Sequence, residues 1–349
     1  MKNVYDIRYE ENLTYILPQK AYSVSETISP AVYTETAVII YLYYIDTLSI
    51  YYRYIDGIPL DIDIYIISSR ENVLEEVRRH IRMMGRKKVT YIVKENQGRD
   101  VSALLITSSE IVKNYRYVCF LHDKKEHHKK IKEDILLWIE NLWGNQIGNS
   151  NYINGILELF EKNENLGIIV PPEPIGEHFD AWYGYGWCKS FEITKAIANK
   201  LSLDADIRPD KPPITLGTVL WFRSKALQKL FDAEWKYSDF NDEDLNNDNY
   251  LSYGLERIYA YVAQDAGYDT GTAMTVSYAE KQTSYLQYAM NMIMHEADLF
   301  FPISKVRDLN IYKRNRRKIL EFGRNNEKIY LYGAGKMGRF CLSILRLEN

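Results

Sequence analysis

The sequence has few cysteines and no long apolar run. Its three cysteines, Cys119, Cys188 and Cys341, are scattered over 349 residues, which argues against both a disulfide framework and a zinc knuckle. The longest apolar run, residues 37–45, is about half of a membrane span. The first residues lack the apolar core of a signal peptide. We therefore expect a soluble protein of the reducing cytoplasm.

An excess of charge of one sign is also missing. Lys and Arg number 44 against 47 Asp and Glu, for a net charge of −3, so the chain offers no general basic surface for nucleic acid. The sequence contains no P-loop, no Ser-His-Asp order and no H-E-x-x-H motif, each of which would have indicated a specific catalytic class. Any activity must therefore be sought in other residue clusters.

What is present is an alternation of strand and helix patterns. Apolar, β-branched runs predict strands at 36–45, 62–67, 89–93 and 117–121, and apolar residues at helical spacing predict helices at 71–84 and 101–112. Ser68 and Glu71 form a capping-box pattern at the start of the first helix. This order predicts an α/β fold with a parallel sheet and right-handed crossovers. After residue 130 the pattern becomes α+β, with strands at 167–170 and 218–222 and a helix at 253–266.

We expect four segments along the chain. Residues 1–30 form an N-terminal arm, 31–300 the main domain, 301–326 a basic linker helix, and 327–349 the start of an incomplete Rossmann-like module. The last segment contains a strand pattern at 328–332 followed by G-x-G-x-x-G at 333–338. Only 11 residues follow, whereas a complete βαβ unit needs about 30, so a dehydrogenase built on this motif is not expected.

Polar clusters follow two of the predicted strands, at the ends where an α/β sheet binds its ligands. The first is Glu95-Asn96-Gln97-Gly98-Arg99-Asp100. Asp100 is compatible with a helix N-cap. The same segment is compatible with a nucleotide cradle, in which Gly98 makes a tight turn and Arg99 and the helix N-terminus face phosphate. Both interpretations can hold together.

The second cluster is His122-Asp123-Lys124-Lys125. One hypothesis is that His122 and Asp123 bind Mn²⁺ or Mg²⁺ beside a diphosphate. The other is that Lys124 or Lys125 neutralises the leaving diphosphate directly. Because only one acid is present where a metal site usually has two, we favour the metal-independent interpretation.

The candidates for a catalytic base lie further along the chain. Glu256 is compatible with a surface ion pair to Arg257, which would contribute little, or with a general base that deprotonates an acceptor hydroxyl. Asp180 lies in a loop rich in glycine and aromatic residues and competes for that role, as do Glu177 and His178. Trp182 and Trp187 of the same loop are predicted to stack on an acceptor sugar.

The ordered set of motifs resembles the rhamnan synthesis protein F family, glycosyltransferases of bacterial cell-surface polysaccharide clusters. The resemblance covers roughly residues 36–280. It is carried by the strand-end clusters above together with Asn141-Leu142-Trp143-Gly144, 167–172, 217–223, 255–257 and 264–268. It implies a GT-A-like nucleotide-diphospho-sugar transferase fold. It also implies transfer of rhamnose, or a related sugar, onto a growing lipid-linked glycan.

On this basis we expect a cytoplasmic, inverting glycosyltransferase with a dTDP- or UDP-linked donor, dTDP-rhamnose being the first choice. The nucleoside would be held by Asp63, Ser68, Asn96 and Asp100. The diphosphate would be held by Arg99, His122 and Lys124 or Lys125. The alternative is a non-catalytic glycan- or partner-binding subunit of a polysaccharide assembly complex, which the missing acid pair supports. The basic stretch 313–318 is compatible with a solvated helix face or with peripheral contact to anionic lipid at the inner face of the cell membrane.

Overall fold

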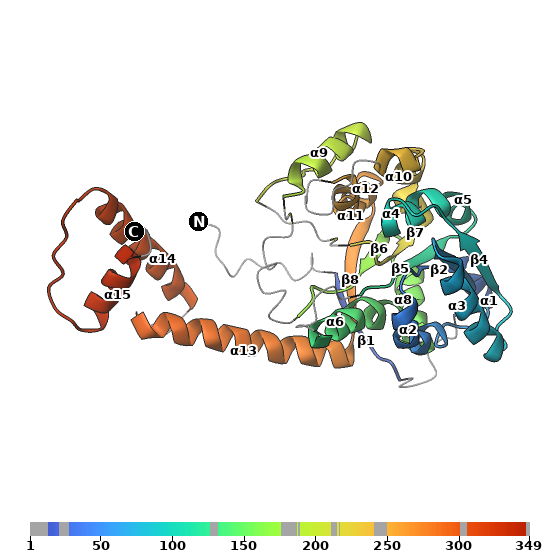
Figure 1. Ribbon diagram of the computed structural model, residues 1–349, viewed down its shortest axis with the longest axis horizontal. Coiled ribbons are helices and arrows are strands. Elements are labelled where there is room, and N and C mark those ends of the chain that lie inside the picture. The colour runs from blue at the N-terminus through green and yellow to red at the C-terminus, as the bar shows by residue number, and fades with distance from the viewer. Residues whose placement is uncertain are drawn as a thin grey trace. The chain divides into compact units, whose positions relative to one another are not determined.

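The protein is built around one mostly parallel sheet with helices on both faces (Figure 1). The computed structural model describes residues 13–20, 28–125, 132–175, 187, 189–210, 215, 217–240, 250–300 and 306–346. In this part of the chain eight strands pair in the order β1-β8-β6-β7-β5-β2-β3-β4, and β7 is antiparallel to both of its neighbours. The strands are β1 Thr14–Leu17, β2 Thr36–Tyr41, β3 Asp63–Ser68, β4 Val89–Val93, β5 Tyr117–His122, β6 Leu166–Val170, β7 Leu220–Arg223 and β8 Asp269–Thr275.

Helices occupy most of the connections between these strands, as the alternating pattern predicted. They are α1 Pro30–Thr34, α2 Leu48–Ile55, α3 Glu71–Met83, α4 Arg99–Ser102, α5 Ser109–Val112, α6 Lys132–Ile139, α7 Asn145–Ile147, α8 Ser150–Lys162, α9 Phe191–Lys200, α10 Gln228–Phe231, α11 Leu251–Glu256, α12 Tyr259–Asp265, α13 Val276–Phe300, α14 Val306–Arg324 and α15 Lys336–Arg346. The α/β fold expected from the sequence is confirmed.

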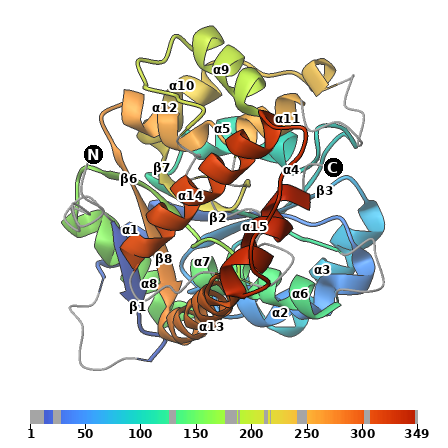
Figure 2. The same cartoon turned by 90° about the vertical axis from the view of Figure 1, so that its left-hand side faces the viewer.

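The central strands are buried on both faces, which explains their continuous apolar sequences. In β2, Val38 and Ile40 pack into one hydrophobic cluster with α2, α3 and α8, while Ile39 and Tyr41 pack into a second cluster with α9, α10 and α12. Figure 2 shows these two groups of helices on opposite sides of the sheet. Because helices cover both faces of the sheet, we expect a ligand-binding site at its edge.

Several local expectations are wrong. The Ser68–Glu71 capping box does not form, because the Ser68 hydroxyl accepts from the Arg70 N–H at 3.1 Å and Arg70 is the N-cap of α3. The helix predicted at 253–266 is broken between α11 and α12. Residues 328–332 form no strand, because no neighbouring strand pairs with them. Two strands had no clear signal in the sequence: β1, inside the predicted arm, and β8.

The chain divides into two compact units, Met1–Ala279 and Glu280–Asn349. In the second unit α14 and α15 pack together, and Phe340 and Ile344 are buried. The glycine turn before α15 is tight, because a Cβ at Gly338 would lie 2.1 Å from the Gly333 carbonyl oxygen. Among the described residues, no helix has the length and apolar character needed to cross a membrane.

Candidate active site

The two polar clusters end strands that are not neighbours. Strands β2 and β3 lie between β4 and β5, which places the ends of β4 and β5 about 14 Å apart. Even so, the Asp100 Oδ2 atom lies 3.7 Å from the His122 Nε2 atom. The chain after β4 therefore turns back across the carboxyl edge of the sheet and brings the first cluster to the second.

The turn after β4 is held by Lys94 and made possible by Gly98. The Lys94 ammonium donates to the carbonyl oxygens of Glu95 and Gln97, at 2.6 and 3.0 Å. Gly98 has φ of +66° and is the N-cap residue of α4. A Cβ at Gly98 would lie 2.7 Å from the Ser102 Cβ and 2.8 Å from the Phe240 ring. Only glycine suits this position, because both the backbone conformation and the close packing disfavour a side chain.

Asp100 and His122 form a buried pair at the centre of the site. The His122 Nδ1 atom lies 3.0 Å from the carbonyl oxygen of Asp123, which can only accept, so Nδ1 carries the proton when the ring is neutral. Burial lowers the pKa of His122 to about 4, and Lys124 adds to this effect. The ring is thus neutral at pH 7, with the Nε2 lone pair facing Asp100.

The Asp100 carboxylate is ionised at neutral pH. Burial alone would raise its pKa, but the charge of the His122 ring in its protonated form and the charge of Lys124 outweigh burial and lower the pKa below its ordinary value. Its Oδ2 atom is buried and has no hydrogen-bond partner among the described residues. The hydroxyl of Thr218 lies beside the same carboxylate. An ionised oxygen with an open position can accept a hydrogen bond from a ligand hydroxyl.

Asp123 has a structural role that the sequence did not predict. Its Oδ2 atom accepts hydrogen bonds from the backbone N–H groups of Tyr43 and Tyr44, both at 2.8 Å. Its side chain is buried, and burial raises its pKa to about 6. The carboxylate therefore anchors the segment that follows β2, and its assignment to donor or metal binding stays a prediction.

Lys124 and Lys125 separate into a site residue and a surface residue. The Lys124 ammonium lies 4.7 Å from the centroid of the Trp138 ring, and its charge acts on Asp100, Asp123 and Glu256. Its backbone is held by the Tyr51 hydroxyl, 2.8 Å from both its N–H and its carbonyl oxygen. Lys125 instead pairs with the exposed Asp46. Lys124 is therefore the better placed of the two to meet a diphosphate.

Glu256 joins the cluster because α11 ends there. Helix α11 contacts α4, and the Glu256 side chain is only 18% exposed, with Oε2 lying 3.6 Å from the Arg257 guanidinium. Burial raises the pKa of Glu256 to about 7, and the negative charge of Asp100 contributes to the increase. Because α11 ends at Glu256, this residue gives the cluster a carboxyl group whose pKa lies near neutral pH.

Other predicted site residues lie elsewhere. Asp63 begins β3 and accepts from the Tyr115 hydroxyl at 2.7 Å. It lies at the amino edge, about 16 Å along the strand from Ser68, so its assignment to nucleoside binding is wrong. Trp187 is 8% exposed and packs against Phe191 and Tyr261, so it cannot stack on a sugar as predicted.

The remaining predicted residues divide into two groups. Asn96 is exposed at the turn, and Ser68 is buried at the end of β3. Both lie on the carboxyl side of the sheet, where the expectation placed them. Asp180 and Trp182 lie outside the described residues.

Sequence reasoning missed the site roles of Lys94, Tyr51 and Thr218, since each acts through a contact with residues distant in the chain or through the backbone.

The donor atoms at this edge do not by themselves fit a divalent metal. No group of three His, Cys, Asp or Glu side chains suited to hold an ion occurs within the described ranges. Asp100 and His122 offer two facing acceptors, but Asp123 is bound to backbone N–H groups. The cations that the side chains bring to the cluster are the Lys124 ammonium and, near Glu256, the guanidinium groups of Arg257 and Arg99.

Comparisons with known proteins give the following matches. A family model described as Rhamnan synthesis protein F matches residues 1–268. Two relatives named Uncharacterized protein WxcX, from Xanthomonas campestris pv. campestris strains B100 and ATCC 33913, are each 24% identical over 183 residues. This match covers 51% of the chain, which spans only 24% of the length of either relative.

Among solved structures, the chain is similar to the mannosyltransferase PcManGT from Pyrobaculum calidifontis in complex with GDP-Man and Mn²⁺. The TM-score is 0.38 and the sequence identity is 12%. The superposition covers 94% of this chain and 73% of the mannosyltransferase chain.

Proposed function

Since the chain belongs to the rhamnan synthesis protein F family, we propose that it is a GT-A-like glycosyltransferase that uses a nucleotide diphosphate sugar as donor. The observation that carries this proposal is the convergence of Asp100, His122, Lys124 and Glu256. They meet at the carboxyl edge of a parallel sheet, where α/β proteins bind their ligands. The cluster combines an ionised acceptor, a cation and a carboxyl group that titrates near neutral pH.

In the proposed reaction the acceptor hydroxyl oxygen attacks the anomeric carbon of the donor sugar. The bond between that carbon and the diphosphate oxygen breaks, and the electron pair leaves with the nucleoside diphosphate. Lys124 and Arg99 stabilise the negative charge that develops there. Glu256 takes the proton of the acceptor hydroxyl as general base. Attack opposite the leaving group inverts the anomeric configuration.

The ionised Asp100 oxygen accepts a hydrogen bond from a hydroxyl group of the donor, with Asn96 next to it at the turn. The neutral His122 ring lies beside Asp100 and adds no second charge. No step of the proposed reaction uses a metal ion, because Lys124 supplies the positive charge. The donor is a dTDP- or UDP-linked sugar, with dTDP-rhamnose the first choice.

The proposed acceptor is a lipid-linked glycan of a growing cell-surface polysaccharide. The enzyme would act in the cytoplasm and meet the inner face of the membrane peripherally. This part of the proposal is supported by the family and by the basic residues of α14, of which Arg314, Arg317 and Lys318 are exposed.

Isothermal titration of the protein with dTDP, UDP and GDP, with and without Mn²⁺, tests the proposal. We expect dTDP or UDP to bind, with an affinity that Mn²⁺ changes by less than about threefold. The Lys124→Met substitution should weaken binding by about tenfold or more, since it removes a charged hydrogen-bond donor to the diphosphate. Lys125→Met is the matched control and should change the affinity by less than about threefold. If no nucleoside diphosphate binds, the proposed function is wrong.

A further inference from the structure

Two buried hydroxyl groups lie beside Asp100 and have no part in the proposed reaction. Thr218 and Tyr259 are fully buried. The Thr218 hydroxyl adjoins both the Asp100 carboxylate and the Tyr259 hydroxyl. Among the described residues, the two hydroxyl oxygens and the Asp100 Oδ2 atom have no hydrogen-bond partner of good geometry. Because buried polar groups in native proteins are nearly always hydrogen-bonded, these groups are the available partners for one another.

Thr218 reaches the site because β7 runs against its neighbours. Strand β7 is antiparallel to β5, so its beginning lies at the edge where β5 ends. Leu220 pairs with Phe120, and the same register continued by two residues places Thr218 opposite His122. The direction of β7 therefore puts this threonine at the carboxyl edge of the sheet.

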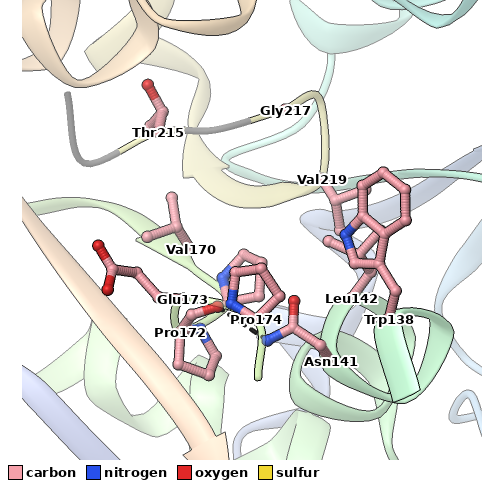
Figure 3. Close-up of a pocket in the computed structure, with 11 residues that line it drawn as sticks. Trp138, Asn141, Leu142, Val170, Pro172, Glu173, Pro174, Thr215, Gly217 and Val219 are labelled. Atoms are coloured by element: carbon pink, nitrogen blue, oxygen red, sulfur yellow. Dashed lines mark hydrogen bonds between the residues drawn. The ribbon is translucent and has the colours of Figure 1, made fainter. Parts of the chain in front are cut away.

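The alternation of side chains along this segment turns Thr218 toward Tyr259. Neighbouring residues of an extended segment face opposite sides of a sheet. Val219 lies beside Trp138 at a small cavity on one side (Figure 3). Leu220 packs on the other side, in the hydrophobic cluster that contains Tyr259. Thr218 comes two residues before Leu220 and so shares the side of Tyr259.

Donors and acceptors allow hydrogen bonds between these groups in one direction. An ionised carboxylate only accepts, so the Thr218 hydroxyl donates to Asp100, and its oxygen is left to accept from Tyr259. Burial raises the pKa of Tyr259 well above its ordinary value, so the phenol keeps the proton that it donates. Hydrogen bonds in a chain strengthen one another, and a bond to a carboxylate stabilises its charged form.

Charged and titratable groups also face Asp100 from several elements. They are Tyr41 at the end of β2, Lys94 after β4, His122 and Lys124 at the end of β5, Glu256 in α11 and Tyr259 in α12. Thr218 and Tyr259 add hydrogen-bonding capacity to this set without adding charge. They can therefore orient the carboxylate without changing the net charge of the site.

We propose that Tyr259 and Thr218 form a hydrogen-bond relay to Asp100 and act as positioning residues for its carboxylate. The inference rests on the proposed function, in which Asp100 accepts a hydrogen bond from a hydroxyl group of the donor. A carboxylate accepts about four hydrogen bonds, so a bond from Thr218 leaves positions for the ligand. The relay fixes the direction of these positions, and its bonds tighten when a ligand binds, as active-site hydrogen bonds commonly do.

Titration of the Asp100 carboxyl group in the free protein tests the relay without any nucleotide. NMR of the aspartate carboxyl carbons follows it in the full chain from about pH 3 to 8, with Asp100→Asn to identify the signal. Thr218→Val keeps the shape of the side chain without the hydroxyl and should raise the titration midpoint by about one pH unit. Tyr259→Phe should raise it by about half as much. Thr218→Ser keeps a hydroxyl and should stay close to the wild-type midpoint.

Isothermal titration with dTDP-rhamnose at pH 7 measures the effect of the relay on the ligand. Thr218→Val should weaken binding by about tenfold and Tyr259→Phe by about threefold. In an Asp100→Asn background, Tyr259→Phe should change the affinity by less than about twofold, because the relay acts through Asp100. A loss on Tyr259→Phe that persists in this background would overturn the relay.

Two substitutions of buried hydroxyl groups elsewhere are matched controls. Thr36 donates to the Val32 carbonyl oxygen at 2.6 Å, and Tyr152 donates to the Asn145 carbonyl oxygen at 2.9 Å. Thr36→Val and Tyr152→Phe should leave the titration midpoint of Asp100 and the donor affinity unchanged.

The two measurements separate the relay from the proposed function. If neither Thr218→Val nor Tyr259→Phe moves the titration midpoint of Asp100, the relay is wrong, and the proposed function stands as long as a nucleotide binds. If the midpoint moves as expected but no nucleotide binds, the relay is supported and the proposed function is wrong.

Discussion

At the scale of residues, the site contains two carboxyl groups whose surroundings move their pKa values in opposite directions. Asp100 is ionised at neutral pH, where the charge of Lys124 acts against the effect of its burial. Burial and the charge of Asp100 raise the pKa of Glu256 to about 7. Carboxyl groups separated in this way are typical of active sites in which one group binds and the other transfers a proton.

The Glu256→Gln variant tests this division. Since only the deprotonated form of Glu256 can act as a base, the rate of transfer should rise with pH through about 7 and level off above it. The variant should lose about 10²- to 10⁴-fold in kcat and the pH-dependent rise attributed to Glu256, while binding of the nucleoside diphosphate changes little. Initial rates between pH 5.5 and 9 measure both effects.

Glu110→Gln is a suitable control, because Glu110 is 83% exposed in a surface pair with Lys113. It should leave the rate and the pH profile unchanged. A Glu256→Gln variant that keeps the wild-type rise near pH 7 would assign the base to another group.

At the scale of elements, the turn between β4 and α4 determines whether Asp100 reaches His122. Gly98 and Arg99 are both in the left-handed region, with φ of +66° and +47°. For Arg99 this conformation is unfavourable by about 1–2 kcal/mol. Non-glycine residues in such conformations cluster at functional sites, which agrees with the position of Arg99 beside Glu256.

Gly98→Ala should lower the free energy of unfolding by about 2 kcal/mol or more, because it adds overpacking to an unfavourable φ. Gly85→Ala is a close control, since Gly85 has φ of +68° and nothing lies within 4 Å of its added Cβ. We expect a loss of only about 1 kcal/mol there. Urea unfolding measures both values. Equal losses would show that the close packing at Gly98 has no effect on stability.

At the scale of the whole molecule, charge is unevenly distributed between the two units. Residues 1–279 contain 31 Lys and Arg against 40 Asp and Glu, whereas residues 280–349 contain 13 against 7. The overall net charge of −3 thus conceals a basic unit attached to an acidic one. A basic unit of this kind suits the anionic surface of a membrane, where a lipid-linked acceptor would be found.

Replacement of Arg314, Arg317 and Lys318 by Ala should therefore weaken binding to vesicles. Co-sedimentation with phosphatidylcholine vesicles containing phosphatidylglycerol should show a loss of about tenfold or more, since each basic residue near the surface contributes about 1 kcal/mol. Pure phosphatidylcholine vesicles should bind neither protein. Replacing Arg79, Lys113 and Lys162, which are also exposed, removes the same charge from the first unit and should have little effect. Equal losses in both variants would exclude α14 as the contact.

The elements that the sequence predicted well are those whose signal is local. Strand β4 matches its predicted run, and β5 extends its run by one residue. Strand β5 is buried at every position, and a strand buried on both faces needs a continuous apolar sequence. Strand β4 lies at an edge of the sheet and is partly exposed, and its β-branched and aromatic residues gave the local signal. The polar residues after these strands were recognisable because each cluster directly follows an apolar run. Strand β1 was not, because its four residues alternate in burial at an edge of the sheet and are stabilised by pairing with the distant β8.

By itself, the sequence determined the α/β class, the two polar clusters and the family resemblance. Only the tertiary structure decided which of the polar side chains meet. The order of strands placed β2 and β3 between the clusters, and the turn at Gly98 brought Asp100 to His122. The tertiary structure also directs the Asp123 carboxylate to backbone N–H groups and places Asp63 at the amino edge of the sheet. The physical reason is that strand pairing and side-chain direction depend on contacts between residues far apart in the chain, which local patterns do not encode.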